Sequence, residues 1–155
     1  MRLERPLLVC VTLIITLLGC AHGPVPIASY DRNHDGRIDE WVYRLDDSKT
    51  EEAFDTNADG KPDLIKIYDN GTLVKIEQDR NHDGRMDLVE EYHDGKLSRV
   101  VRDDNFDGKP ETVEIYRKGK LAMIEHDPNG AGVADSVDYY ENDRLIRTDR
   151  SRPKN

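Results

Sequence analysis

Short runs of alternating apolar and polar residues recur along the chain, and they come in pairs that flank a tight turn. In the clearest pair, LIKIY at 64–68 and TLVKIEQ at 72–78 lie on either side of Asn70-Gly71. Asn and Gly both tolerate the positive φ that a type I′ turn requires, so this pattern predicts a β-hairpin. The turn sets an expected register with three cross-strand pairs: Tyr68–Leu73, Ile67–Val74 and Ile65–Ile76.

The same hairpin pattern returns three more times, as LVEEY/KLSRVV, TVEIY/KLAMIE and SVDYY/RLIRT. No segment after residue 30 has a sustained helical period, so the sequence predicts an all-β fold. We expect an up-and-down antiparallel sheet of about ten strands, with the hairpin turns along one edge. Its apolar face must be covered, which strong curling can achieve either as an open sheet or as a closed barrel.

Strand alternation divides the predicted hairpins into two faces. One face should gather the aliphatic residues Ile65, Ile67, Val74 and Ile76 and their equivalents in later units. The other should carry four Tyr–Leu pairs: Tyr68/Leu73, Tyr92/Leu97, Tyr116/Leu121 and Tyr140/Leu145. We interpret these tyrosines as packing pairs beside the turns; a ligand-binding aromatic row is the less favoured alternative.

Between the hairpins lies a nonapeptide of the form D-x-N-x-D-G-x-x-D. Its copies start at residues 31, 55, 79, 103 and 127, so the period is 24 residues throughout. An exact period of this size indicates an array of stacked supersecondary units. The domain organisation predicted from it is a signal at 1–19, a tether at 20–30, five loop-plus-hairpin units at 31–150 and a basic tail at 151–155.

The nonapeptide offers side-chain oxygens at positions 1, 3, 5 and 9, a glycine at position 6 and a backbone carbonyl at position 7. This layout resembles the EF-hand calcium loop, and because strands flank it here, it is closer to the helix-free loops of thrombospondin type 3 repeats and integrin propellers. The resemblance implies about four Ca²⁺ sites, with these ligands: Asp31, Asn33, Asp35, Arg37 (carbonyl) and Asp39; Asp55, Asn57, Asp59, Lys61 (carbonyl) and Asp63; Asp79, Asn81, Asp83, Arg85 (carbonyl) and Asp87; Asp103, Asn105, Asp107, Lys109 (carbonyl) and Glu111.

Two alternatives accompany the calcium interpretation. Asp, Asn and Gly also form good turns without any metal, and Mg²⁺ takes oxygen ligands but demands a stricter octahedron. The fifth loop has Ala131 at position 5, so we expect it to bind poorly. Whether Glu90, Glu114 or Asp138, at position 12 of their units, complete a site is left open by the sequence.

The hairpin unit Y-x-x-G-x-L resembles MORN and MORN-variant repeats, which occur in scaffolds and in antitoxin-like bacterial proteins. The match covers only a few positions in each unit. The first unit, EWVYRLDDSKTEEAF, lacks both the glycine and the leucine. We therefore expect it to be a capping unit with a polar, unpaired outer strand.

The N-terminus has the features of a secretory signal: Arg2 and Arg5 precede the apolar run LLVCVTLIITLLG. The run ends in Leu17-Leu18-Gly19-Cys20, which resembles a bacterial lipobox and implies that Cys20 carries the lipid. An ordinary signal peptide with a chance cysteine is the alternative. With Ala21 after the cysteine, the resemblance implies a lipid-anchored envelope protein and favours the outer membrane, facing the periplasm, over the inner membrane as the alternative.

The chain is strongly acidic, with a net charge of −9, so no basic stripe is available for nucleic acid. No nucleophile elbow or privileged His–carboxylate pair is present, which argues against an enzyme. The sequence therefore predicts a lipid-anchored binding or scaffold module with structural calcium and an unidentified protein or envelope partner. The first alternative is an inhibitor or immunity-type protein, and a glycan-active enzyme is less favoured.

Overall fold

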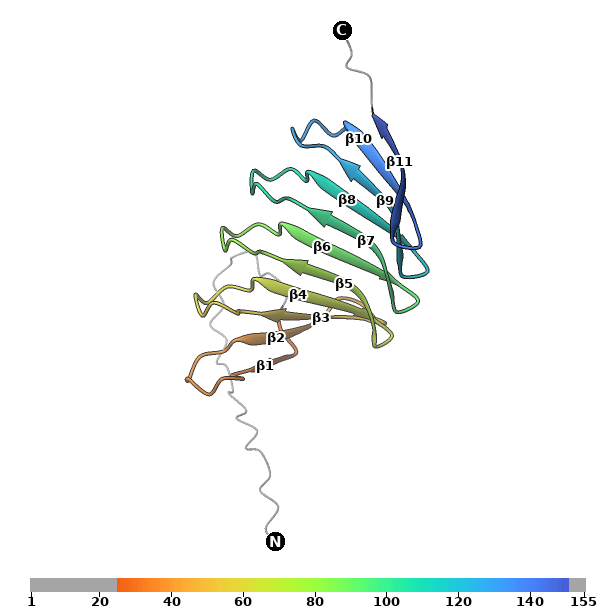
Figure 1. Cartoon of the computed structure of the whole chain (residues 1–155). Helices are drawn as coiled ribbons and strands as arrows, with labels where there is room; N and C mark the ends of the chain where they lie inside the picture. Colours follow the sequence, from red (N-terminus) through yellow and green to blue (C-terminus); the bar gives the residue numbers. More distant parts are fainter. Residues whose placement is uncertain (1–24, 151–155) are drawn as a thin grey trace.

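The computed structural model describes residues 25–150, which form one antiparallel sheet without a helix (Figure 1). Its eleven strands are β1 (Ala28–Tyr30), β2 (Glu40–Arg44), β3 (Lys49–Phe54), β4 (Leu64–Asp69), β5 (Thr72–Gln78), β6 (Leu88–His93), β7 (Lys96–Arg102), β8 (Thr112–Arg117), β9 (Lys120–His126), β10 (Ser136–Glu141) and β11 (Arg144–Arg150). The predicted all-β, up-and-down fold is confirmed.

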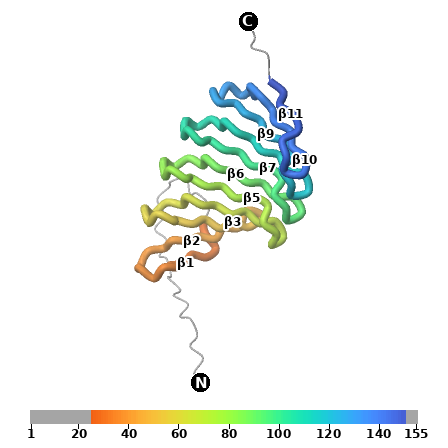
Figure 2. The backbone as a smooth tube through the Cα atoms, in the orientation of Figure 1, coloured from red at the N-terminus to blue at the C-terminus, as the bar shows by residue number. Residues whose placement is uncertain are grey.

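The strands follow one another across the sheet in sequence order, and each pairs only with its neighbours in the chain. β1 and β11 each have a single partner, so the sheet is open and the closed alternative is wrong. The successive hairpins stack along the twisting sheet, with the tight turns on one side and the nonapeptide loops on the other (Figures 1 and 2). This is the quasi-one-dimensional arrangement typical of repeat proteins.

The hairpin turns have the predicted backbone. Asn70 and Gly71 take φ values of 48° and 75°, both in the left-handed region that a type I′ turn needs. Three later hairpins repeat this pattern, at Asp94-Gly95, Lys118-Gly119 and Asn142-Asp143. The last of these uses no glycine and relies on Asn and Asp, the non-Gly residues that best tolerate positive φ.

The predicted register is correct only beside the turn. Tyr68 pairs with Leu73 as expected, but a β-bulge follows, and Ile67 then pairs with Lys75 rather than with Val74. Ile76 accordingly pairs with Lys66 and not with Ile65. The same irregularity occurs in the hairpins β6–β7, β8–β9 and β10–β11. A bulge places two residues of one strand opposite one of the other, and this shifts every pair beyond it.

This shift also overturns the predicted segregation of aliphatic side chains. Because pairing residues share a face, Ile65 and Ile67 lie on the face of Glu77 and Lys75, while Ile76 lies on the opposite face with Lys66. The described residues form a single layer, and only Ala53 and Val100 among their hydrophobic side chains are buried. The expected covering of one apolar face is therefore not seen in residues 25–150; both faces are mixed and mostly half-buried.

The N-terminal end extends further than expected. Ala28–Tyr30, from the predicted tether, form β1 and pair with Glu40–Val42 of β2. The first hairpin therefore does not end the sheet with an unpaired outer strand. Its connection lacks the Asx-Gly turn; instead the Asp46 carboxylate accepts hydrogen bonds from the backbone N–H groups of Ser48 and Lys49, at 2.8 and 2.7 Å.

Candidate metal-binding loops

Backbone hydrogen bonds join each nonapeptide loop to the next along one edge of the sheet. The N–H of Asp55 donates to the carbonyl of Asp39 at 2.9 Å, which links the first residue of loop 2 to the last residue of loop 1. The equivalent bonds, each 2.8 Å long, are Asp79–Asp63, Asp103–Asp87 and Asp127–Glu111. Positions 1 and 9 of the pattern therefore hold neighbouring loops together as well as shaping each loop.

Inside each loop, the position 1 carboxylate organises the turn. In loop 3, Asp79 accepts hydrogen bonds from the N–H groups of Asp83, at 3.2 Å, and Gly84, at 2.7 Å. The glycine has φ of 91°, and His82 at position 4 also has a positive φ, of 60°. This explains the fixed glycine, since an L side chain at that φ strains the backbone. Loops 1, 2 and 4 use the same bonds: Asp31 to Asp35 and Gly36, Asp55 to Asp59 and Gly60, and Asp103 to Asp107 and Gly108.

Positions 3 and 5 form a second set of bonds within the turn. In loop 4 the Asn105 amide oxygen accepts from the N–H of Asp107 at 2.8 Å, and the Asp107 carboxylate accepts from the N–H of Lys109 at 3.0 Å. Asn33, Asn57 and Asn81 have the same role as Asn105, and Asp35, Asp59 and Asp83 the same role as Asp107. Arg37, Lys61 and Arg85 are thereby fixed through their N–H groups; the metal-ligand role predicted for the position 7 carbonyls stays a prediction.

The position 9 carboxylate closes the loop by accepting hydrogen bonds from the residues just after position 1 of the same loop. Asp39 accepts from the N–H groups of Arg32 and Asn33, at 2.9 and 3.2 Å. Asp63 accepts from the N–H and the hydroxyl of Thr56. Asp87 accepts from the N–H of Arg80 at 2.7 Å and forms an ion pair with its guanidinium.

Loop 4 brings three carboxylates together. Asp103, Asp107 and Glu111, at positions 1, 5 and 9, each place one oxygen within 4.8 Å of the others. Glu111 still accepts from the N–H of Asp104 at 2.8 Å, and its other oxygen accepts from the Asn105 amide. Glu111 has one methylene more than the aspartates at position 9 of the other loops, so it reaches further into the turn. Within residues 25–150, no other set of three acidic side chains converges so closely.

The predicted ligands of loops 1–3 occupy the expected loops, but their carboxylates do not converge as tightly. Several predicted ligands are nevertheless withdrawn from solvent, because the sheet edge buries positions 1 and 9 of loops 2 and 3 and position 1 of loop 4: Asp55, Asp63, Asp79, Asp87 and Asp103. Every buried side-chain oxygen and nitrogen in the described chain has a hydrogen-bond partner. For Asp55, Asp79 and Asp103 the donors include neutral backbone amides, which satisfy the oxygens without cancelling their charge.

Loop 5 keeps the turn without the position 5 carboxylate. The N–H of Ala131 donates to Asp127 and Asn129 at 3.1 and 3.0 Å, and the N–H of Gly132 donates to Asp127 at 2.6 Å. Ala131 supplies no side-chain oxygen, and the expectation that loop 5 binds calcium poorly stays a prediction. Position 9, Asp135, accepts from the Asn129 amide at 3.3 Å.

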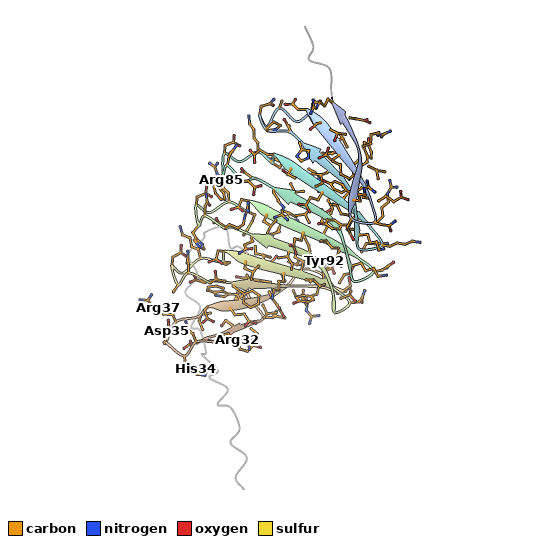
Figure 3. All side chains as sticks on the ribbon, in the orientation of Figure 1. Arg32, His34, Asp35, Arg37, Arg85 and Tyr92 are labelled. Carbon is orange, nitrogen blue, oxygen red and sulfur yellow. The ribbon has the colours of Figure 1, made fainter. Side chains whose placement is uncertain are left out.

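Side chains also pass between neighbouring loops. Arg80 of loop 3 donates to the carbonyl of Asp103 and to the carboxylate of Asp104, both at 2.9 Å. A Cβ added at Gly130 would lie 2.7 Å from Lys109 Cδ, so the stem of Lys109 covers the backbone of loop 5. The loop edge is thus a continuous structure, and Figure 3 shows Arg85 among its projecting side chains.

Two polar groups outside the predicted ligand set are also built into the sheet. Glu40 is only 2% exposed and is covered by the Arg32 guanidinium. Asp138 accepts from the Thr148 hydroxyl and lies 3.2 Å from His126 Nε2, and the Thr148 bond, followed by His126, lowers the pKa of Asp138. The sequence offered a signal for the first group, since Glu40 occupies a position where the second and third units have Leu64 and Leu88.

The predicted lipidation site, Cys20, lies outside the described residues. In residues 25–150 the structure contains no helix that is long and apolar enough to cross a membrane. No protein-family model matches the chain, and no curated protein does either.

Proposed function

We propose that this chain is a lipid-anchored module of a bacterial cell envelope whose nonapeptide loops bind calcium as structural staples. The sheet then serves as a binding surface or scaffold. The observation that best supports calcium is loop 4, where Asp103, Asp107 and Glu111 bring three carboxylate oxygens within 4.8 Å of one another. Three like charges at that separation repel strongly, and a divalent cation that takes hard oxygen ligands removes the repulsion.

The donor set fits calcium better than the other common metals. Its side-chain ligands are all carboxylate or amide oxygens on a short, flexible turn, which is the chemistry that Ca²⁺ accepts. In loop 4 the ligands would be Asp103, Asn105, Asp107 and Glu111, with the carbonyl of Lys109. The Asn105 oxygen already accepts a hydrogen bond from Asp107, so it would use its remaining lone pair or rotate.

The four complete loops should not bind equally. Asp63 and Asp87 are held at the loop entrance, and the Arg80 guanidinium competes for Asp87. Those carboxylates must give up or share hydrogen bonds before they can ligate a metal. Loop 4 needs the least rearrangement, so we expect it to be the tightest site.

Structural calcium also explains why the loop recurs. A sheet with few buried apolar side chains gains little from a core, and each strand touches only its neighbours. The loop edge joins each hairpin to the next through backbone bonds such as Asp103–Asp87. A cation that gathers the carboxylates beside those bonds would hold adjacent hairpins in register.

Thermal unfolding of the full chain in detergent tests this proposal. Calcium at about tenfold over Kd should stabilise the folded state by about 1.4 kcal/mol per site, and Kd should lie near 10⁻⁴–10⁻³ M. Millimolar calcium should therefore raise Tm, chelator should lower it, and magnesium should have a smaller effect. A Tm that is the same in calcium and in chelator contradicts the proposal.

Anchoring is tested separately, by Cys20→Ser. Loss of the acylated thiol should release the protein from membranes after cell fractionation, because covalent lipid provides the attachment. Cys10→Ser is the matched control, since that cysteine is expected to leave with the signal, and its variant should stay with the membrane. Retention of the Cys20→Ser protein after a high-salt wash would count against the lipobox interpretation.

A further inference from the structure

The last strand, β11, is exposed in a way that the other long strands are not. All seven of its residues are exposed, whereas six of the seven residues of β9 are half-buried. Leu145 and Ile146 retain 48% and 59% exposure. Leu145 and Ile146 keep the apolar character of the earlier hairpins, and their exposure follows from the missing neighbour: in residues 25–150, β11 pairs with β10 alone.

The earlier repeat units show which residues of β11 a neighbouring strand would pair with. Beside β5, β7 and β9, an antiparallel strand pairs with the last four residues, as β6 does with Lys75–Gln78. The equivalent segment of β11 is Arg147–Arg150, 72 residues further along. A twelfth strand placed there would continue the sheet with the same direction and register.

This free segment is basic, although the chain as a whole has a net charge of −9. It carries Arg147 and Arg150 against one acid, Asp149. The Arg147 guanidinium lies 4.1 Å from the centre of the Tyr139 ring and 3.1 Å from Asp149, so it is held in place beside the edge. Within the array, Lys75 stands at the position of Arg147 and pairs across the unit boundary with Glu91.

An apolar groove lies on the face of the sheet across β8–β11. It has a volume of about 360 Å³ and is lined by residues that include Ile115, Met123, Tyr139 and Ile146. Its lining comes mostly from β8, β9 and β10, and Ile146 is the β11 residue that reaches it. Affinity from main-chain bonds and selectivity from side-chain positions are the properties of strand addition.

We propose that the free edge of β11 takes an extended acidic segment of a partner protein as a twelfth, antiparallel strand. Its carboxylates lie opposite Arg147 and Arg150, as Glu91 lies opposite Lys75. A second copy of β11 is a poorer occupant, because it brings a second set of arginines to the same short ladder, where like charges destabilise pairing. β1 of another copy is also a poor match, since it has only three residues.

The test uses the full chain in detergent with calcium present and two fluorescein-labelled peptides. The acidic probe is Thr-Glu-Val-Thr-Glu-Tyr-Thr, which places its two glutamates opposite Arg150 and Arg147 in the array register. The basic probe replaces both glutamates with lysine. Fluorescence anisotropy should show the acidic probe binding at least about tenfold more tightly, with an advantage that declines as salt is added. On binding, hydrogen exchange of the β11 amides should slow.

Charge reversal makes the test specific. The double variant Arg147→Glu/Arg150→Glu should reverse the preference, so that the basic probe binds more tightly. The matched control is Arg99→Glu, which changes the equivalent position in β7, where both edges are already paired. It should leave the preference unchanged.

Three results would overturn the proposal: no binding of either probe, equal binding of both, or an equal effect of the control variant. Sedimentation of the chain without peptide tests whether a second copy of the chain binds at this edge instead. Dimers that disappear in the double variant would show that a second copy occupies the edge. Failure of the calcium proposal would appear as a Tm that is the same in calcium and in chelator. Failure of the strand-addition proposal would appear in the peptide binding, so the two failures can be told apart.

Discussion

Loops 4 and 5 have nearly the same backbone, yet only loop 4 gathers three carboxylates. In both, position 6 is a glycine with positive φ, 88° at Gly108 and 79° at Gly132, and in both it donates to the position 1 carboxylate. The third carboxylate differs, because Asp107 is replaced by Ala131. Loop 5 therefore shows that this turn forms without a carboxylate at position 5.

The comparison separates what the turn needs from what a metal would need. The position 5 aspartate adds two bonds, because Asp107 accepts from the N–H of Lys109 and from the side-chain amide of Asn105, but the turn forms without them in loop 5. Turn formation alone thus explains positions 1, 3 and 6 of the pattern and leaves most of position 5 unexplained. A ligand role for that carboxylate accounts for its presence in the four complete loops.

The largest expected effect comes from exchanging the residues that distinguish the two loops. Asp107→Ala should remove one bound calcium from a parent value of about four, and Ala131→Asp should add one. At free calcium near 100 Kd, each site contributes about 2.7 kcal/mol, so the two variants should change stability in opposite directions by up to that amount. Equilibrium dialysis gives the calcium count. An unchanged count in both variants would mean that position 5 belongs only to the turn.

A second pair of variants addresses the backbone that the loops share. Gly108→Ala and Gly132→Ala both force an L side chain into positive φ, which should cost about 1–2 kcal/mol in each. No backbone atom obstructs either methyl group: the Gly132 site is open, and at Gly108 the nearest atom is the Arg85 guanidinium, at 3.2 Å. Chemical denaturation in chelator should give similar losses for the two. A loss confined to Gly108→Ala would contradict the view that both turns are built alike.

Local features of the sheet could be predicted from the sequence, and longer-range ones could not. The turn at Asn70-Gly71 depends on two residues with a strong conformational preference, so the pattern identified it. The bulge beside Tyr68 depends on how two strands twist against each other, and no residue type marks it; that is why the predicted Ile67–Val74 pair is wrong. β1 was missed because Ala28–Tyr30 show no alternation and gain order from the free edge of β2.

The candidate metal-binding loops also have features that the sequence predicts and features that it does not. The nonapeptide itself gives the types and the spacing of the predicted ligands, and in the structure these residues all lie in the loops along one edge. Convergence of the carboxylates was not predictable, because it depends on one methylene in Glu111 and on competitors such as Arg80 and Thr56. Side-chain length and competing donors at variable positions decide which of the similar loops is ready for a cation.

The hairpins that follow the two loops differ in their hydrogen-bonded side chains, and a third prediction uses that difference. In the fourth unit, the Tyr116 hydroxyl donates to Glu114, and burial followed by that bond raises the pKa of Tyr116 to about 12. A phenol whose pKa is raised by folding stabilises the protein below pH 10, and the contribution is lost as pH rises through 12. Tyr116→Phe should cost about 1 kcal/mol at pH 8 and progressively less above pH 10.

The matched control is Tyr140→Phe in the fifth unit. There Asp138 takes the place of Glu114 and accepts from Thr148. This variant should show a smaller loss at pH 8, because Asp138 accepts from Thr148 rather than from the tyrosine. Urea denaturation between pH 8 and 12 measures both proteins, and equal pH profiles would show that the Tyr116–Glu114 bond does not set the alkaline limit.

The smallest effect is expected at Thr148, where the last strand departs from the apolar residue of earlier units, Ile124 and Val100. The Thr148 hydroxyl is the main cause of the lowered pKa of Asp138, and His126 is the next. A carboxyl whose pKa is lowered by folding stabilises the protein above its ordinary pKa, and that contribution is lost as pH falls through the folded value. Thr148→Val should therefore raise the pKa of Asp138 toward its ordinary value, measured by NMR titration. Because the site is exposed, Tm at pH 7 should fall by no more than about 2 °C. An unchanged Asp138 pKa would mean that His126, and not Thr148, is the main cause of its lowering.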